Sequence, residues 1–253
     1  MASRFSSWWK PMPVDNCPRC GGSGWIFRVV EDQEAVVRCR CDEETRAERF
    51  AARSGIPPLY ENASTENYLL PKDNPIAHRA LASVMLAVRT YAREYPAVEK
   101  PGLLLIGETG VGKTHLAVAA LNGLIQRGFE GVFFDYQTLL DRIRSGYDRS
   151  SGSMDKEAYR LALDCEILLL DDLGAHRVTD WVEDTVASII THRCNHRKPV
   201  IVTTNLPPPG QTTKSAKDSL SDRIGARAWS RLNEMCKIIS MPAVEDYRVR
   251  GRR

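Results

Sequence analysis

Residues 102–114 of the chain read GLLLIGETGVGKT, and this stretch decides the fold. It begins as a short apolar run and ends in a glycine-rich turn that matches the P-loop pattern in full. The matching residues are Gly107, Glu108, Thr109, Gly110, Val111, Gly112, Lys113 and Thr114. Residues 112–126 then have the apolar spacing of a helix. The turn is therefore expected between a strand and a helix, as the motif requires, and the alternative is a plain glycine-rich turn.

The P-loop residues point to ATP and Mg²⁺ as ligands. The glycines let the backbone wrap a phosphate with its N–H groups, and the helix that follows adds the positive end of its dipole. Lys113 is expected to contact the β- and γ-phosphates, and the Thr114 hydroxyl is expected to bind Mg²⁺. All eight residues of the pattern are therefore candidate ATP-binding residues.

Strand and helix patterns alternate downstream of the P-loop. Three more strands are predicted by apolar or β-branched runs at residues 131–136, 166–170 and 200–203. Helical patterns occupy residues 137–147, 179–195 and 221–236. Continuous apolar strands that alternate with helices imply a parallel sheet covered on both faces. Residues 148–153 are polar without an apolar period and predict a loop.

Two of these strands end in polar side chains. Asp171 and Asp172 follow an apolar strand, which delivers carboxylates to the edge of the sheet where the phosphates bind. Asp171 is expected to hold Mg²⁺, directly or through water, and Asp172 to orient and activate the attacking water. Asn205 ends the strand at residues 200–203 and would reach the γ-phosphate or its water. The alternative for the acids is an ordinary pair of aspartates at a strand-to-turn junction.

Composition places the chain among ordinary globular proteins. It is 43% hydrophobic and 26% charged, and its net charge of +3 is too small to name a partner. The sequence from residue 207 onward contains ten Lys and Arg residues but only five Asp and Glu residues, so basic charge is concentrated at the C-terminus. Apolar runs such as residues 167–170 are far too short to cross a bilayer. We therefore expect a cytoplasmic location and no membrane contact.

Four of the seven cysteines group near the N-terminus, at Cys17, Cys20, Cys39 and Cys41. A reducing compartment argues for thiols or metal rather than disulfides. Cys17 and Cys20 form a zinc-knuckle pattern that is followed by glycines, and Cys39 and Cys41 would complete a tetrahedral Zn²⁺ site. Only one residue separates Cys39 from Cys41, which is less usual in zinc sites than a separation by two residues. Free reduced cysteines and a redox or iron–sulfur centre are the alternatives.

These patterns divide the chain into three parts. Residues 1–53 are expected to form the cysteine module and a connecting helix. Residues 54–74 contain Gly55-Ile56-Pro57-Pro58, whose prolines favour extended backbone, and are interpreted as a linker. Residues 75–253 would form the ATPase domain, which starts with an amphipathic helix at residues 75–95 and ends in the basic tail.

The order of the motifs resembles a known family. The P-loop, LDDLG at residues 170–174 and TTN at residues 203–205 are similar to the AAA+ replicative helicase loaders of the DnaC and DnaI type. Transposition helper ATPases of the IstB type share this core. The resemblance covers residues 54–250. It implies an AAA+ P-loop NTPase fold, an α/β parallel sheet flanked by helices, with a small N-terminal zinc-binding module.

The resemblance also implies roles for late residues. Asn205 would be sensor 1, and Arg248 in DYR at residues 246–248 would be sensor 2. Arg231 would be the arginine finger that one subunit gives to its neighbour, with Arg227 as the competing candidate. Asp172 stands where many AAA+ ATPases carry glutamate, which favours slow, switch-like hydrolysis.

The implied function is an ATPase that loads a hexameric replicative helicase onto single-stranded DNA. ATP would assemble the loader as an oligomer, and hydrolysis would release it. Loaders of the DnaI type carry an N-terminal zinc domain that binds the helicase, so the cysteine module is a candidate partner-binding element. Trp8, Trp9 and Trp25 would supply apolar anchors, or would only pack the module.

Two other functions remain open. A transposase-associated ATPase of the IstB type would act on duplex DNA, but the cysteine module favours the loader. A non-enzymatic, zinc-containing nucleic-acid-binding adaptor would keep only a vestigial nucleotide site. The complete set of Lys113, Thr114, Asp171 and Asp172 argues against the adaptor.

Overall fold

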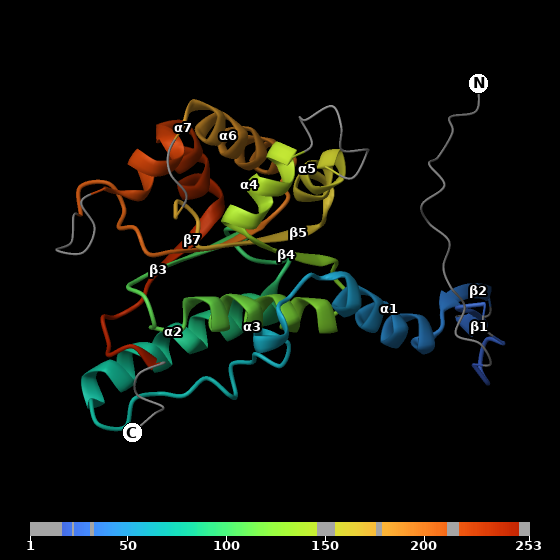
Figure 1. The fold of residues 1–253 in the computed structure, drawn as a ribbon. Coiled ribbons are helices and arrows are strands. Elements are labelled where there is room, and N and C mark those ends of the chain that lie inside the picture. Colours follow the sequence, from blue (N-terminus) through green and yellow to red (C-terminus); the bar gives the residue numbers. More distant parts are fainter. Residues whose placement is uncertain are drawn as a thin grey trace. The chain divides into compact units, whose positions relative to one another are not determined.

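The computed structural model describes residues 17–21, 23–30, 33–145, 155–175, 179–211 and 218–247. The chain divides into two compact units, Met1–Arg49 and Phe50–Arg253 (Figure 1). Trp8, Trp9, Arg248, the loop expected at residues 148–153 and the end of the basic tail lie outside the described residues. Within the described part, no helix has the length and apolar character needed to cross a bilayer.

The small unit contains a β-hairpin next to the cysteines. Strands β1 (Trp25–Val30) and β2 (Gln33–Arg38) pair antiparallel, with Phe27 opposite Val36, and helix α1 (Arg40–Arg53) begins directly after Cys39. Trp25 and Phe27 lie on the same face of β1 because side chains two residues apart share a face. The side chains of Trp25, Phe27 and Val36 are 49%, 79% and 56% exposed. The hairpin therefore presents an apolar face to solvent.

The large unit is built on a five-stranded parallel sheet. Its strands are β3 (Gly102–Ile106), β4 (Gly131–Asp135), β5 (Ile167–Asp171), β6 (Val200–Thr204) and β7 (Cys236–Ser240). Their order across the sheet is β4-β5-β6-β3-β7, so β6 is inserted between β3 and β5. The carboxyl ends of parallel strands meet at one edge of the sheet, where open α/β sheets bind their ligands. This order places the P-loop and the two polar strand ends side by side.

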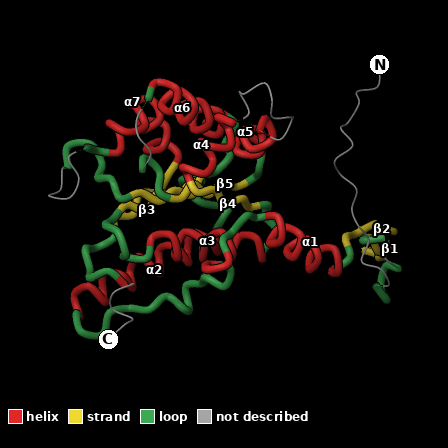
Figure 2. The backbone as a smooth tube through the Cα atoms, in the orientation of Figure 1, coloured by secondary structure: helices red, strands yellow, loops and turns green. Residues whose placement is uncertain are grey.

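Helices cover both faces of the sheet (Figures 1 and 2). They are α2 (Pro75–Glu94), α3 (Lys113–Gln126), α4 (Tyr136–Ser145), α5 (Asp155–Asp164), α6 (Asp180–Asn195) and α7 (Leu220–Met235). Leu103 and Leu105 of β3 pack with α2 and α3, whereas Leu104 and Ile106 pack with the helices of the other face. Successive strand residues thus enter two separate cores, which is why the strands are apolar throughout.

Helix α7 contains a break at Gly225, where φ is 81° and ψ is 150°. The Glu183 carboxylate of α6 fills the space where a Cβ of residue 225 would lie, so only glycine fits there without a shift. The helix expected at residues 221–236 is therefore two helical pieces. Arg227 and Arg231 both lie on the second piece.

The segment at residues 54–74 lies along α3 in the larger unit. The Asn122 side chain donates to the carbonyls of Glu61 and Ala63 at 3.1 and 3.0 Å. The His115 ring Nε2 lies 2.9 Å from the carbonyl oxygen of Ser64. These contacts, together with the 3-10 turn η1 (Pro58–Tyr60), fix the path of the segment toward the P-loop.

Candidate active site and metal centre

The P-loop lies between β3 and α3, with Lys113 as the first helical residue. Gly110 and Gly112 have φ of 82° and 88°, values that L side chains rarely adopt, so glycine is needed at both positions. Lys113 is 5% exposed, and its Nζ donates to the carbonyl of Glu108 at 2.8 Å and to Oδ1 of Asn205. The fold therefore brings the P-loop lysine and the polar end of β6 into direct contact.

The first acid of β5 lies beside the P-loop threonine. The Thr114 hydroxyl donates to Oδ2 of Asp171 at 3.1 Å, and the Thr203 hydroxyl donates to Oδ1 at 2.6 Å. Burial raises the pKa of Asp171, and the hydrogen bond from Thr203 opposes this rise. Adjacent ligands of octahedral Mg²⁺ at 2.0–2.1 Å from the ion are about 3 Å apart. The Thr114 and Asp171 oxygens therefore have a spacing that suits a shared Mg²⁺.

The second acid, Asp172, lies in the turn that follows β5, at the same edge of the sheet as Asp171. Asp172 has φ of 55°, and its backbone N–H donates to the Thr203 hydroxyl at 2.9 Å. Its Oδ1 lies 3.5 Å from Nδ2 of Asn205. Thr203 therefore links both acids to β6, a role that sequence reasoning missed. The TTN segment at residues 203–205 marks this position in the sequence, but it does not show that Thr203 contacts both acids.

The arginine candidates on α7 differ in their surroundings. Arg231 forms an ion pair with Glu234 at 2.7 Å on its own helix. Arg227 is exposed, and among the described residues it has no ion pair. Sensor 2 was expected at Arg248, which lies outside the described part of the chain.

Comparisons with known proteins identify the core that carries these residues. The family model described as IstB-like ATP binding protein matches residues 88–253. The chain belongs to this IstB-like family. Membership means that its AAA+ P-loop core is that of an ATP-binding protein and ATPase.

Relatives of this IstB-like chain include replication proteins. The replicative helicase loader DnaC of Escherichia coli strain K12 is 23% identical over 226 residues, which are 88% of this chain and 85% of that protein. The phage-like element PBSX protein XkdC of Bacillus subtilis strain 168 is 22% identical over 93% of this chain and 87% of its own length.

Solved structures of helicase loaders have folds similar to that of this chain. The crystal structure of the DnaC helicase loader is 30% identical, has a TM-score of 0.61, and matches over 74% of this chain and 100% of its own. The DnaI structure, at 20% identity and a TM-score of 0.58, covers 79% of this chain and 99% of its own, and shows the fold. The expected AAA+ fold of the helicase loader type is therefore confirmed.

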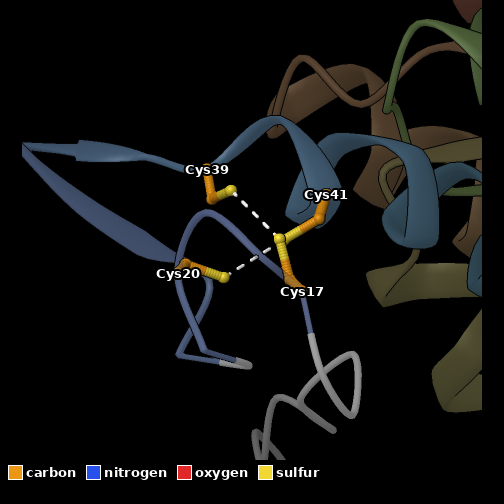
Figure 3. A group of neighbouring side chains, drawn as sticks. All are labelled: Cys17, Cys20, Cys39 and Cys41. Atoms are coloured by element: carbon orange, nitrogen blue, oxygen red, sulfur yellow. Dashed lines mark hydrogen bonds between the residues drawn. The ribbon is translucent and has the colours of Figure 1, made fainter.

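The cysteine cluster of this IstB-like chain lies outside the region that the family model matches. The four sulfur atoms of Cys17, Cys20, Cys39 and Cys41 all lie within 4.8 Å of one another (Figure 3). Cys17 and Cys39 sulfurs are 3.8 Å apart, and Cys20 and Cys41 sulfurs are 3.4 Å apart. Tetrahedral Zn²⁺ with Zn–S bonds near 2.3 Å requires sulfur separations of about 3.8 Å. The cluster therefore has the size of a Zn²⁺ site.

Backbone donors around the cluster also suit thiolates. The Gly24 N–H points at the Cys20 sulfur at 3.4 Å. Backbone hydrogen bonds from Arg19 and then Cys20 lower the pKa of Cys17. Such N–H groups stabilise the deprotonated sulfur that binds metal. The donor set of four thiols with N–H support thus fits Zn²⁺, in agreement with the zinc-knuckle pattern.

Proposed function

We propose that the chain loads a hexameric replicative helicase onto single-stranded DNA. The observation that carries this proposal is its similarity to a replicative helicase loader over most of both chains, 88% of this one and 85% of the relative. A similarity confined to the ATPase core would support only the P-loop chemistry. The match instead covers more of the chain than residues 75–253, the expected ATPase domain.

ATP binding and slow hydrolysis would act as the assembly and release switch. Lys113 would hold the β- and γ-phosphates, while Thr114 and Asp171 would bind Mg²⁺. Asp172 would activate the attacking water, and Asn205 would sense the γ-phosphate from the end of β6. The contacts among these side chains support the proposal, because all five lie together at one edge of the sheet.

The cysteine module would bind Zn²⁺ and contact the helicase. Its hairpin exposes Trp25, Phe27 and Val36 on the small unit. Large aromatic side chains are typical anchors of protein interfaces. We infer that this face is the part of the module that meets the partner.

DNA contact and self-association complete the proposal. The excess of Lys and Arg after residue 207 favours attraction to phosphate backbones. The arginine finger would join subunits, because an arginine of one protomer would act on ATP held by the next.

The test uses the purified chain and the hexameric replicative helicase encoded in the same genome. With ATP, the chain should form a complex with the helicase and deposit it on circular single-stranded DNA, measured as unwinding of an annealed strand. Lys113→Ala should abolish deposition. Phe27→Ser should weaken helicase binding while the variant keeps Zn²⁺ and ATPase activity. A chain that neither binds the helicase nor stimulates unwinding would overturn the proposal.

A transposition helper is the second candidate, because the matching family model is IstB-like. Such a protein would bind duplex DNA and a transposase rather than a helicase. The same preparation therefore separates the two functions: ATP-dependent binding to duplex DNA without helicase binding would favour the second candidate.

A further inference from the structure

The outer surface of the P-loop is held by two segments from distant parts of the chain. The Tyr68 hydroxyl donates to the carbonyl of Val111 at 2.8 Å. The backbone N–H of Tyr247 donates to the carbonyl of Gly110 at 3.1 Å. Two successive carbonyls of the phosphate-binding turn therefore accept hydrogen bonds from residues outside the motif.

Close packing accompanies these hydrogen bonds. A Cβ built on Gly112 would lie 2.6 Å from Cε2 of Tyr68, so the ring lies directly against the loop. The Asp246 carboxylate occupies the corresponding position at Gly110. The turn is thus supported by side chains from the outside.

Tyr68 is itself held firmly. Its ring packs against the His115 ring with centroids 5.6 Å apart, and His115 contacts the Ser64 carbonyl of the same segment. Burial raises the pKa of Tyr68 to about 12, so its hydroxyl keeps its proton at neutral pH. It is therefore a fixed hydrogen-bond donor.

The geometry of the peptide group links these hydrogen bonds to the direction of two N–H groups in the P-loop. The N–H and C=O of a trans peptide point in opposite directions in one plane. The carbonyls of Gly110 and Val111 share their peptides with the N–H groups of Val111 and Gly112. Donors outside the loop therefore turn these two N–H groups inward, where a phosphate is bound. Hydrogen bonds to a carbonyl also polarise its peptide, which strengthens the N–H as a donor.

We propose that Tyr68 and the backbone of Tyr247 are positioning residues, which orient the N–H groups of the P-loop toward the β-phosphate. The inference rests on the proposed nucleotide site and adds two residues to it. Neither residue needs to touch the nucleotide. Their effect should therefore follow the phosphates of the ligand and not its base.

Tyr68→Phe removes one hydroxyl and keeps the ring. A typical hydrogen bond corresponds to an affinity change of about two- to tenfold, so ADP and inorganic pyrophosphate should each bind more weakly by about this factor. AMP has no β-phosphate, and its affinity should not change. Tyr60→Phe, in the same segment, is the matched control and should alter none of these affinities.

Tyr247→Pro tests the second contact, because proline has no N–H. ADP and pyrophosphate should again bind more weakly, and Tyr247→Ala, which keeps the N–H, should bind both more tightly than Tyr247→Pro does. Competition against a fluorescent ATP analogue measures all of these affinities. Urea unfolding without nucleotide checks that every variant is folded.

The outcomes separate the inference from the function on which it rests. If the wild type binds no nucleotide, the proposed site itself is wrong. If the wild type binds but folded Tyr68→Phe and Tyr247→Pro bind pyrophosphate equally well, the positioning role is wrong. A loss of AMP affinity with unchanged pyrophosphate affinity would instead assign Tyr68 to the base.

Discussion

At the scale of single residues, Asp172 is the side chain whose chemistry can be tested most directly. Asparagine has nearly the same shape and tolerates the left-handed backbone found at this position, so Asp172→Asn changes little except the charge. We expect the variant to bind ATP normally and to hydrolyse it at least about 10²-fold more slowly, since the water loses its activating carboxylate. Single-turnover hydrolysis and equilibrium ATP binding measure the two effects.

Lys113→Ala is the comparison for this experiment, because it should lose ATP binding itself. If Asp172→Asn loses ATP binding while the residual complex turns over normally, then Asp171 and Asp172 have been assigned in the wrong order.

Arg193 of α6 is a second residue with a measurable role. It is fully buried, and burial lowers the pKa of its guanidinium. Its side chain donates to the carbonyls of Ala162, Leu163, Cys165, Glu166 and Pro199. It therefore satisfies the C-terminal end of α5 and the entry to β6, which are far apart in the sequence.

Arg193→Met should leave these carbonyls buried without donors and lower the free energy of unfolding by about 3 kcal/mol or more. Urea unfolding is the measurement. Exposed Arg197→Met on the neighbouring turn is the control and should change stability by less than about 0.5 kcal/mol. Equal stabilities of the two variants would contradict the assigned role of Arg193.

At the scale of elements, the hairpin and α1 depend on the cysteine cluster that joins them. Cys17 and Cys20 precede β1, while Cys39 and Cys41 bracket the start of α1. A structural Zn²⁺ contributes roughly 10 to 16 kcal/mol in small peptides, which is more than so small a unit can obtain from its own core.

The purified chain should therefore carry one Zn²⁺. Cys20→Ser should release it and unfold the small unit, measured as increased hydrogen exchange at residues 17–41. Cys194→Ser, outside the cluster, is the matched control and should keep the metal. Elemental analysis that finds no zinc in protein prepared without chelators would rule this site out.

Elements with a clear apolar pattern could be predicted from the sequence, whereas β7 and α5 could not. Strands β3, β5 and β6 are apolar on both faces, and α2 has the residue spacing of an amphipathic helix. These sequence patterns therefore predict the four elements. Edge strand β7 alternates, with Lys237 and Ser240 exposed, and was missed. Helix α5 was missed because its residues were not separated from the polar loop before it.

Only part of the candidate site could be predicted from the sequence. Motif residues such as Lys113 are recognised from their spacing within a short stretch of sequence. Tyr68 and Thr203 act through contacts with residues far away in the sequence, and no local pattern marks such contacts.

At the scale of the whole molecule, the finger requires a neighbouring subunit. An arginine acting on ATP of the next protomer stabilises the charge of the transition state and is worth about 10³ to 10⁵ in rate. The resemblance implies Arg231, and its exposed ion pair with Glu234 costs only about 1 kcal/mol or less to open, so this pair does not prevent the role. We therefore expect Arg231→Ala to lose more hydrolysis than Arg227→Ala, with normal ATP binding in both.

Mixing subunits tests action between protomers. The impaired arginine variant and Lys113→Ala are each inactive alone, but a mixed interface can pair an intact P-loop with an intact finger. Partial recovery of ATPase activity is the expected result. No recovery despite demonstrated co-assembly would count against a finger, and a larger loss in Arg227→Ala would transfer the role to Arg227.

The position of β3 in the sheet has a consequence for synthesis on the ribosome. Both neighbours of β3 are strands that follow it late in the chain, β6 and then β7. A nascent chain that has just emerged with its P-loop therefore has no partner strand beside β3, and Lys113 has no Asn205 to contact. Pairings between residues so distant in sequence form late in folding. We therefore expect the nucleotide site to form only after β6 and β7 have left the ribosome, so a nascent chain that ends before β6 should not capture ATP.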